Sequence, residues 1–395
     1  MDYLKLVNRN KKLFTRDIEH NEEELTNIVK ENSFLVIGGA GTIGQSVVKQ
    51  IFKRNPRILH VIDISENNLV ELVRDIRSSL GYIDGDFRTF ALDVGSKIFD
   101  AFWKSKQEYN YVLNLSALKH VRSEKDVYTI MRMIEVNILN SMKLASNMHE
   151  QGNGSYFCVS TDKAANPANV MGASKRLMEK FLLGGNFNFN FTMARFANVA
   201  FSDGSLPFGF LQRIMKNQPI SAPRDIKRYF VTPEESGELC LCSALLGQNA
   251  DIFFPKSETE MELTTFSDVA INFLKQRSLK PIICESEQEA RLLCEKLDLS
   301  KEYPCYFFDS DTTGEKPFEE FYTATDNVKF DIFKDIGVIK SEAQGLNSRS
   351  FKEFEAMYQM LISGTMSKAS IVEQFQMLIP EFDHLELGKY LDERM

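Results

Sequence analysis

The sequence predicts an α/β protein with a Rossmann-type doubly wound parallel sheet, a smaller mixed α/β lobe and an N-terminal helical extension. Two observations carry this prediction. Apolar runs of strand length alternate with stretches of helical periodicity from residue 34 to about residue 196, which is typical of a parallel sheet covered by helices on both faces. A glycine-rich turn directly follows the first apolar run, as it does in many sheets of this kind.

Each expected element rests on its apolar pattern. We expect strands at residues 35–38, 59–62, 87–92, 111–115, 156–160, 191–196 and 281–284. We expect helices at residues 45–54, 130–148, 211–216, 236–246, 286–297, 351–362 and 370–378. In the first of these helices, Val47, Val48 and Ile51 recur at the spacing of one helical face. After residue 204 proline, glycine and aromatic residues interrupt the alternation.

The length and these patterns predict the domain organisation. At 395 residues the chain is longer than a usual single domain. We expect residues 1–30 to form a charged helical extension that packs on the main body or on a neighbouring subunit. Residues 31–200 are expected to form the Rossmann domain. Residues 201–395 are expected to form the second lobe, which would bind a substrate, and the C-terminal region.

Composition and charge exclude several classes of function. The net charge of −8 argues against broad nucleic-acid binding, which needs a basic surface. We see no apolar run long enough to cross a membrane and no signal-peptide pattern, and we expect a cytoplasmic protein without membrane insertion. The six cysteines include no CxxC pair. Because no histidine or further cysteine lies near Cys240 and Cys242, we expect reduced thiols and no metal site.

The glycine-rich turn predicts a dinucleotide site. Gly38, Gly41 and Gly44 stand between a strand and a helix, where glycines permit a tight turn, a close approach of pyrophosphate and close helix packing. Asp63 ends the second expected strand, nineteen residues after Gly44. A carboxylate there accepts hydrogen bonds from ribose hydroxyls and repels a 2′-phosphate, which favours NAD over NADP. The cofactor contacts expected from this half are Gly38, Gly41, Thr42, Ile43, Gly44 and Asp63, with Asp93 and Val94 at the adenine edge.

A second group of polar residues follows the expected strand at 156–160. Thr161, Asp162 and Lys163 come directly after Ser160, and Lys175 lies twelve residues beyond Lys163. Hydroxyl, acid and amine groups at the carboxyl end of a parallel strand are placed where such folds bind ligands. This order of motifs, a dinucleotide site before an acid and a base, indicates a cofactor-using enzyme.

Five segments carry a family resemblance, residues 38–44, 115–121, 160–167, 171–176 and 195–199. In them the chain resembles the extended short-chain dehydrogenase/reductase superfamily, and within it the nucleotide-sugar 4,6-dehydratases, most closely the capsular-polysaccharide UDP-N-acetylglucosamine 4,6-dehydratases. The resemblance covers roughly residues 34–240 and matches residues 313–316 more loosely. It implies an NAD-dependent enzyme that oxidises C4 of a nucleotide sugar, eliminates water across C5–C6 and returns hydride to C6. We also expect a homo-oligomer.

The chain departs from this superfamily at its usual Tyr-x-x-x-Lys motif. The tyrosine position is Met171, which has no acid–base chemistry, and only Lys175 remains. The resemblance includes an active dehydratase subfamily with methionine here, in which Thr161 or Asp162, assisted by Lys175, would replace the phenol. Lys163 would remove the C5 proton, and Asp162 would protonate the departing C6 hydroxyl. The resemblance further implies retention of configuration at C5.

Other residues around this centre have expected binding roles with plain structural alternatives. Ser116, Ala117, Lys119 and Lys175 are expected to contact the nicotinamide half of the cofactor, and Asn137 to steady the segment after residue 115. Lys119, His120, Asn198, Arg213 and Arg228 are the expected substrate contacts, with forked arginine donors suited to a diphosphate. Lys119 could instead be a plain surface residue, His120 a packed residue, and each arginine part of a solvated ion pair.

Two other functions remain open from the sequence. An NAD-dependent nucleotide-sugar 4-epimerase would share the fold but would not need the Asp162–Lys163 pair, which could instead be a surface salt bridge. A non-enzymatic NAD-sensing or scaffold protein is supported only by Met171. The intact acid–lysine pair argues against both.

Overall fold

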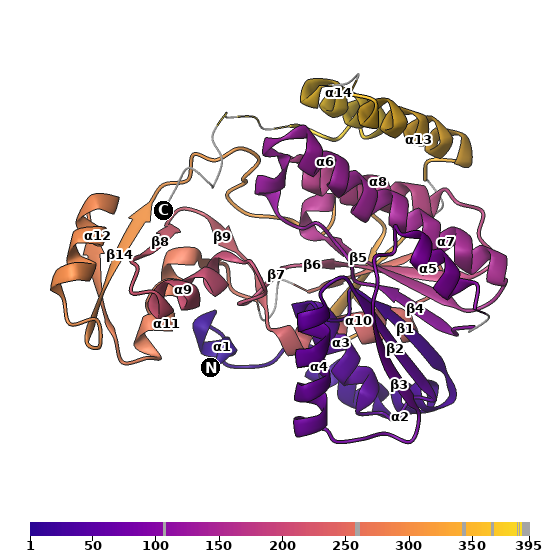
Figure 1. The fold of residues 1–395 in the computed structure, drawn as a ribbon, viewed down its shortest axis with the longest axis horizontal. Helices are drawn as coiled ribbons and strands as arrows, with labels where there is room; N and C mark the ends of the chain where they lie inside the picture. The colour runs from indigo at the N-terminus through magenta and orange to yellow at the C-terminus, as the bar shows by residue number, and fades with distance from the viewer. Residues whose placement is uncertain are drawn as a thin grey trace.

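The computed structural model describes residues 1–105, 108–256, 261–341, 345–364, 367–384, 386 and 388. A nine-stranded sheet with the order β15-β16-β11-β6-β5-β4-β1-β2-β3 forms its centre. Figure 1 shows this sheet and its helices beside a smaller lobe that contains α9, α11 and α12. The first strands along the chain are β1 Ser33–Ile37, β2 Ile58–Asp63, β3 Asp86–Ala91, β4 Tyr111–Asn114, β5 Ser155–Thr161 and β6 Asn190–Phe196.

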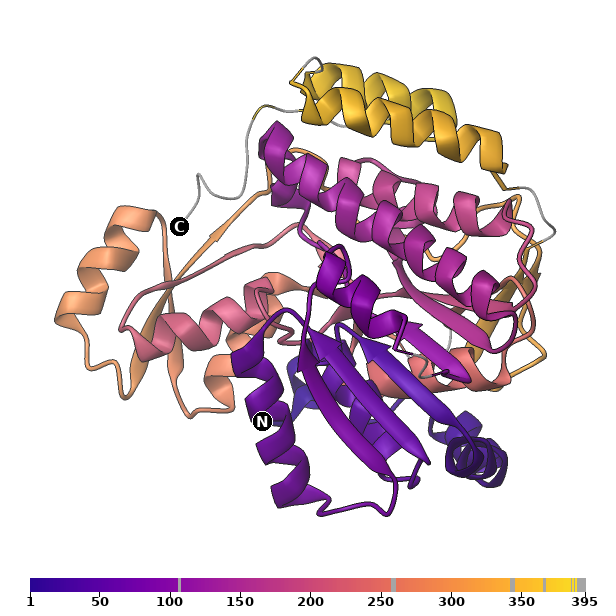
Figure 2. The same cartoon turned by 45° about the vertical axis from the view of Figure 1, so that its right-hand side comes forward.

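The predicted doubly wound sheet is confirmed. All neighbours from β3 through β2, β1, β4 and β5 to β6 pair in parallel. Helices α6, α7 and α8 lie on one face of the sheet, and α3 and α10 lie on the other (Figures 1 and 2). Because both faces are covered, the central strands read as apolar runs. These helices and their neighbours are α3 Thr42–Phe52, α4 Glu66–Ser79, α5 Lys97–Trp103, α6 Val127–Ile134, α7 Asn140–Gln151, α8 Val170–Leu183 and α10 Pro233–Leu246.

The main sheet continues beyond β6 with residues from the second half of the chain. Strand β11, Asp251–Pro255, pairs in parallel with β6, and β16, Ile336–Lys340, pairs antiparallel with β11. Strand β15, Val328–Lys329, lies outside β16. The expected unit of residues 201–395 is therefore divided, because α10, β11, β15 and β16 belong to the main sheet and its helical layer. Their burial against β6 extends the same core.

The smaller lobe has its own core. A three-stranded parallel sheet with the order β13-β14-β8 packs with three helices. The strands are β8 Ile220–Pro223, β13 Lys280–Cys284 and β14 Glu302–Phe308, and the helices are α9 Leu206–Met215, α11 Phe266–Lys275 and α12 Glu287–Lys296. Phe210, Phe273 and Tyr303 are among the buried residues of this second core. Two short strand pairs lie outside both larger sheets: β7 Asn198–Val199 with β10 Phe230–Val231, and β9 Lys227–Arg228 with β12 Thr264–Thr265.

The N-terminal extension packs on its own chain and contacts both lobes. Helix α1, Tyr3–Leu6, lies beside the small lobe, and Leu6 is part of the small-lobe core. Helix α2, Thr15–Glu31, packs against α10 of the main domain. Between them, the Arg9 guanidinium donates two hydrogen bonds, of 2.9 and 2.6 Å, to the buried Glu235 carboxylate.

The helix expected at residues 130–148 is interrupted. Helices α6 and α7 are separated by a π-helical segment, Glu135–Leu139, a rare geometry that is frequent at functional sites. The C-terminal helices α13, Ser348–Ile362, and α14, Lys368–Leu378, pack on α6 and α8, as Figure 2 shows. In the part of the chain that the structure describes, no helix combines the length and apolar character needed to cross a membrane.

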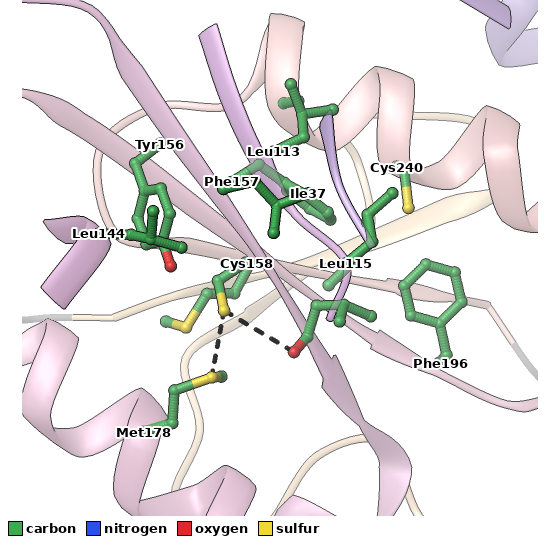
Figure 3. Packing of buried hydrophobic residues seen from close by; sticks show 14 of the residues in the cluster. Ile37, Leu113, Leu115, Leu144, Tyr156, Phe157, Cys158, Met178, Phe196 and Cys240 are labelled. Carbon is green, nitrogen blue, oxygen red and sulfur yellow. Dashed lines mark hydrogen bonds between the residues drawn. The ribbon is translucent and has the colours of Figure 1, made fainter. Parts of the chain in front are cut away.

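Three of the six cysteines, Cys158, Cys240 and Cys242, lie in the core of the main domain. Cys158 on β5 and Cys240 on α10 are fully buried, and all six cysteines are free. Figure 3 shows Cys158 beside Met178 of α8, among Leu115, Phe157 and Phe196. Burial raises the pKa of the Cys158 thiol, which keeps it protonated and unreactive.

Candidate active site

The carboxyl ends of β1, β4 and β5 meet at one edge of the main sheet. Strand β1 pairs with β4, and β4 pairs with β5, so the turns after these strands are neighbours. The chain order reverses between β1 and β4, which is where open parallel sheets bind ligands. The glycine-rich turn, Ser116 and the Thr161 segment all follow strands of this group.

Two glycines of the turn are required by the packing, and the third leaves open space. Gly38 has φ of +70°, and a Cβ atom there would lie 2.7 Å from the Ser116 nitrogen. A Cβ atom on Gly44 would lie 2.2 Å from the Gly38 oxygen, so α3 can approach the turn only with glycine there. A Cβ atom on Gly41, the residue before α3, would meet only the Gly38 oxygen, at 3.6 Å. The surface over Gly41 and the amino end of α3 therefore has room for a pyrophosphate.

Asp63 is tied to the glycine-rich turn by hydrogen bonds. Its Oδ2 accepts from the Ala40 N–H at 3.0 Å, and its Oδ1 accepts from the Ser65 N–H at 2.9 Å. Thr42, at the start of α3, accepts a hydrogen bond from the Asp203 N–H at 3.0 Å. Each carboxylate oxygen of Asp63 retains acceptor capacity for a ribose hydroxyl. Ile43 packs against the main core.

Asp93 is held by a cation from the π-containing helix. Its carboxylate accepts hydrogen bonds from the Gly95 N–H and the Arg132 guanidinium, both at 2.9 Å. Desolvation opposes ionisation, but these two donors hold the pKa of Asp93 below its ordinary value. Val94 is buried, and its carbonyl accepts from Lys143 at 2.9 Å. Asp93 and Val94 thus lie just after the carboxyl end of β3.

Asn137 holds the segment that follows β4. Its side-chain amide accepts from the Leu118 N–H at 2.9 Å and donates to the Leu118 oxygen at 3.1 Å. It also donates to the Ser174 hydroxyl of α8 at 2.9 Å. The π-helical segment carries Asn137, so this distorted part of the helix is hydrogen-bonded to the backbone of Leu118.

Thr161, Asp162 and Lys163 form one hydrogen-bonded cluster at the end of β5. The Asp162 Oδ1 atom accepts from the Thr161 hydroxyl at 2.8 Å, the Lys163 N–H at 2.8 Å and the Lys163 Nζ at 3.1 Å. The Asp162 and Lys163 side chains are 6% and 13% exposed. This pair is therefore a largely buried cluster at the ligand-binding edge, whereas an ordinary surface salt bridge would be solvated.

Lys175 and Met171 lie deeper on α8. Lys175 Nζ donates to the Val159 oxygen of β5 at 3.1 Å and lies 3.9 Å from the Met178 sulfur. Burial lowers the pKa of Lys175. Met171 is 4% exposed and packs in the main core. The structure thus brings Thr161, Asp162 and Lys163 together, while Lys175 bonds to the strand backbone beneath them.

Lys119 and His120 face the loop that follows β7. Lys119 Nζ donates to the Ser202 hydroxyl at 3.4 Å, and desolvation lowers the pKa of Lys119 although Asp203 opposes the shift. Desolvation, assisted by the charges of Lys119 and Arg122, lowers the pKa of His120 to about 4. The imidazole is therefore neutral near pH 7 and can accept or donate a hydrogen bond without carrying charge.

The remaining candidate binding residues are spread over the small lobe and its junction with the sheet. Asn198 begins β7, Asn198–Val199, and its backbone N–H donates to the Tyr229 oxygen at 3.0 Å. Arg213 on α9 donates to Gln218 at 3.0 Å. Arg228 is 4% exposed and donates to the Lys316 oxygen at 2.9 Å. The donors of Arg228 are thus engaged within the protein, whereas Arg213 lies on an accessible helix.

The segment at residues 311–320 packs against the start of α8 and against Lys163, a contact that the sequence did not predict. Asn169, at the start of α8, donates to the Gly314 oxygen at 2.9 Å, and Asn166 donates to Glu320 at 2.8 Å. The Glu319 carboxylate lies 3.8 Å from Lys163 Nζ. The loosely matching residues 313–316 were the one sequence signal for this segment. No periodicity connects it with residues 161–163, so only the folded chain reveals the contact.

Fold and site together are those of an α/β protein with a Rossmann-type parallel sheet and a glycine-rich turn at the point where its strand order reverses. Residues 34–341 match the family described as "Polysaccharide biosynthesis protein". The chain belongs to this polysaccharide biosynthesis protein family.

Several curated proteins are similar in sequence. An uncharacterized membrane protein of Methanocaldococcus jannaschii is 31% identical over 240 residues, which cover 59% of this chain and 69% of that protein. A UDP-N-acetylglucosamine 4,6-dehydratase (inverting) of Campylobacter jejuni is 26% identical, over 70% of this chain and 81% of that enzyme. A UDP-glucose 4-epimerase of Rickettsia bellii is 27% identical, over 58% of this chain and 67% of that enzyme. The match spans only 38% of the length of two further bacterial relatives.

Solved structures show the same fold. Pen from Bacillus thuringiensis superposes with a TM-score of 0.64 at 20% identity, over 84% of this chain and 99% of that one. The enzyme WbmF of Bordetella bronchiseptica, in complex with NAD+, superposes with a TM-score of 0.51 at 18% identity, over 63% and 79%.

Proposed function

We propose that the protein is an NAD-dependent nucleotide-sugar 4,6-dehydratase that acts on UDP-N-acetylglucosamine or a close relative. The product would be a 4-keto-6-deoxy sugar nucleotide for surface polysaccharide or glycan biosynthesis. The observation that carries the proposal is the buried Asp162–Lys163 pair at the carboxyl end of β5, on the same edge of the sheet as the glycine-rich turn and separated from it by β4. Family membership and the dehydratase relative support it.

The residues around the glycine-rich turn fit NAD. The open side of Gly41 and the amino end of α3 suit the pyrophosphate, and Asp63 suits the ribose hydroxyls. Thr42, Ile43, Asp93 and Val94 extend this surface toward the adenine. Ser116, Ala117, Lys119 and Asn137 would hold or position the nicotinamide half. Bound NAD+ supplies hydride acceptance from C4 and hydride return at C6.

Thr161 and Asp162 provide a route for the C4 hydroxyl proton in the absence of a tyrosine. Their 2.8 Å hydrogen bond lets the Thr161 hydroxyl accept the C4 proton as it passes its own proton to the Asp162 carboxylate. The Asp162 carboxyl group can then donate this proton to the C6 hydroxyl, which leaves as water. Asp162 thus ends the elimination as a carboxylate, as it began the oxidation.

Lys163 would act on C5. A neutral Lys163 amine takes the C5 proton after C4 has become a ketone, so the C5–H bond breaks as the C5–C6 double bond forms and the C6–O bond breaks. The resulting ammonium returns the proton to C5 when hydride reaches C6. Return to the original face would retain the configuration, and NMR analysis of C5 would test this prediction.

Met171 and Lys175 would support the site rather than exchange protons with the sugar. Met171 packs against the core and can shape the pocket as an apolar wall. Lys175 adds a buried amine beneath β5 near Val159. On the substrate side, Lys119, His120, Asn198 and Arg213 are candidate contacts. Arg228 would act indirectly, because it holds residues 316–317.

The second candidate is an NAD-dependent nucleotide-sugar 4-epimerase, favoured by the similarity to a UDP-glucose 4-epimerase. Mass spectrometry of UDP-N-acetylglucosamine incubated with the protein and NAD+ separates the two. A 4,6-dehydratase yields a product lighter by one water, whereas an epimerase yields a product of unchanged mass. Unchanged mass with an inverted C4 would overturn the dehydratase proposal.

A further inference from the structure

The contact between Glu319 and Lys163 is unexplained by the proposed roles of residues 161–163. Glu319 Oε1 lies 3.8 Å from Lys163 Nζ and 3.9 Å from Arg228 Nη2. The Glu319 side chain is 4% exposed. A buried carboxylate needs compensating charge or a proton, and here its nearest cation is the amine that must be neutral to act as a base.

We propose that Glu319 is the positioning residue that accepts a proton from the Lys163 ammonium and so converts Lys163 into a base. This inference rests on the proposed dehydratase function and deepens it. An N–H bond of the ammonium breaks, its electron pair stays on Nζ, and an O–H bond forms on Glu319 Oε1. A charged buried pair becomes a neutral one, and the proton returns when the site is empty.

The surroundings of Glu319 suit a group that changes protonation. Desolvation raises the pKa of Glu319, and the nearby charge of Asp162 raises it further. The positive charges of Lys163, Arg228 and Lys316 oppose that rise. Asp162 already accepts hydrogen bonds from Thr161, from the backbone N–H of Lys163 and from Lys163 Nζ at 3.1 Å. In the proposed reaction Asp162 also takes up the C4 hydroxyl proton, so Glu319 is the second carboxylate that can hold the proton of Lys163.

The structure holds Glu319 against Lys163 from both sides. Arg228 donates to the Lys316 and Pro317 oxygens at 2.9 and 3.4 Å, and the Lys227 N–H donates to the Pro317 oxygen at 3.0 Å. These bonds fix the backbone just before Glu319. On the other side, Asn166 binds the neighbouring Glu320 at 2.8 Å.

The test compares Glu319→Gln with Glu353→Gln, at an exposed glutamate on α13 away from the site. Dehydration rates are measured from pH 6.5 to 9.5 with NAD+ and UDP-N-acetylglucosamine. Without Glu319, Lys163 must lose its proton to solvent. The Glu319→Gln rate should therefore fall about 10²-fold near neutral pH and rise roughly tenfold per pH unit. Wild type and Glu353→Gln should show no such slope.

Each outcome decides between the two proposals. Wild-type protein that forms no dehydrated product overturns the proposed function itself. If wild type is active and Glu319→Gln dehydrates at the same rate, only the role of Glu319 is overturned. The same holds if Glu319→Gln loses dehydration rate by the same factor at every pH. If Glu319→Gln does not fold, Glu319→Asp keeps a proton acceptor and should retain the wild-type pH profile. A tenfold rise per pH unit in that variant would contradict the inference.

Discussion

At the residue scale, proton transfer is assigned to groups that already touch one another. Thr161 and Lys163 both donate hydrogen bonds to the Oδ1 atom of Asp162, at donor–acceptor distances of 2.8 to 3.1 Å. The methionine at position 171 therefore removes one acid–base group without leaving the site empty of such groups. Although Asp162 and Lys163 touch, one is an acid and the other an amine, and we expect them to serve different steps.

Lys163→Ala should separate oxidation from elimination. The variant keeps Thr161 and Asp162, so hydride transfer from C4 should proceed and NADH absorbance should appear without dehydrated product. Asp162→Asn is the matched comparison, because it removes both the C4 proton acceptor and the C6 proton donor. That variant should lose about 10²–10⁴-fold in NADH formation as well as in dehydration. Equal NADH formation in the two variants would contradict this division of roles.

Asp63→Ala should weaken the preference for NAD. The carboxylate would repel a 2′-phosphate, and its loss removes both that repulsion and a ribose hydrogen bond. We expect isothermal titration to show tighter binding of NAD than of NADP by wild type and a smaller difference in the variant. Because Asp63 also binds the Ala40 N–H, Asp63→Asn is the control that preserves its shape. Equal affinity of wild type for both cofactors would contradict the assignment.

At the element scale, α10 carries a buried acid whose ionisation opposes folding. Glu238 is 7% exposed, and its Oε2 has no hydrogen-bond partner among the described residues. Desolvation, with the charge of Glu234, raises the pKa of Glu238 from 4.5 to about 7. The folded state therefore holds this proton more tightly than the unfolded state does. The associated stabilisation is full below pH 4.5 and is lost as the pH rises through about 7.

Glu238→Gln should remove this pH dependence. Near pH 4 the variant should match wild type, because the Glu238 carboxyl group is then mostly neutral in both the folded and the unfolded state. At pH 8 it should be more stable by up to about 3 kcal/mol, since one unit of pKa shift corresponds to about 1.4 kcal/mol. Urea unfolding at both pH values measures the difference. Glu353→Gln, at an exposed position on α13, is the control and should show no such change. A difference in unfolding free energy between Glu238→Gln and wild type that is the same at both pH values would refute the prediction.

The elements that the sequence predicted well are those whose burial leaves a local pattern. Strands β1, β2, β5 and β6 lie inside a sheet covered on both faces, so each is an apolar run near its observed bounds. The π-helical segment around Asn137 leaves no such pattern, because it changes the backbone geometry within a continuous helical run. The return of β11 and β16 to the main sheet depends on pairing between distant residues, which periodicity does not record.

The site followed the same rule. Gly38, Gly44 and the segment at residues 161–163 are close in sequence to the strands that position them, so motif and spacing located them. Glu319 reaches Lys163 through the long connection between the small lobe and β15. Arg228 illustrates the opposite case, because its side-chain type suggested a diphosphate contact. Its guanidinium donates to backbone oxygens of residues 227, 316 and 317 and lies within 4 Å of the Glu315 and Glu319 carboxylates.

At the scale of the whole molecule, segments distant in sequence join the two lobes around the site. Residues 1–31 contact the small-lobe core through Leu6 and the main domain through α2. Asp17 accepts hydrogen bonds from the Lys334 and Asp335 N–H groups, at 2.6 and 2.7 Å. The buried Arg9–Glu235 pair lies within this junction, with side chains 3% and 0% exposed. The N-terminal segment is thus part of the folded body.

Arg9→Met should destabilise the protein by about 3–5 kcal/mol, because it leaves the buried Glu235 without its cation. Lys12→Met is the matched control, since it removes an ion pair with Glu234 whose side chains are about half exposed. Its cost should be below about 1 kcal/mol. Urea unfolding measures both values, and equal costs would show that the N-terminal junction does not depend on the buried pair.

The most direct measurement of the central claim uses UDP-N-acetylglucosamine labelled with deuterium at C4. The protein is incubated with this substrate and NAD+, and the product is examined by mass spectrometry and NMR. We expect a product lighter by one water that carries the deuterium in its C6 methyl group, because hydride leaves C4 and returns at C6. Deuterium that stays on C4, in a product that keeps its C6 oxygen and has unchanged mass, would contradict the assignment and identify an epimerase.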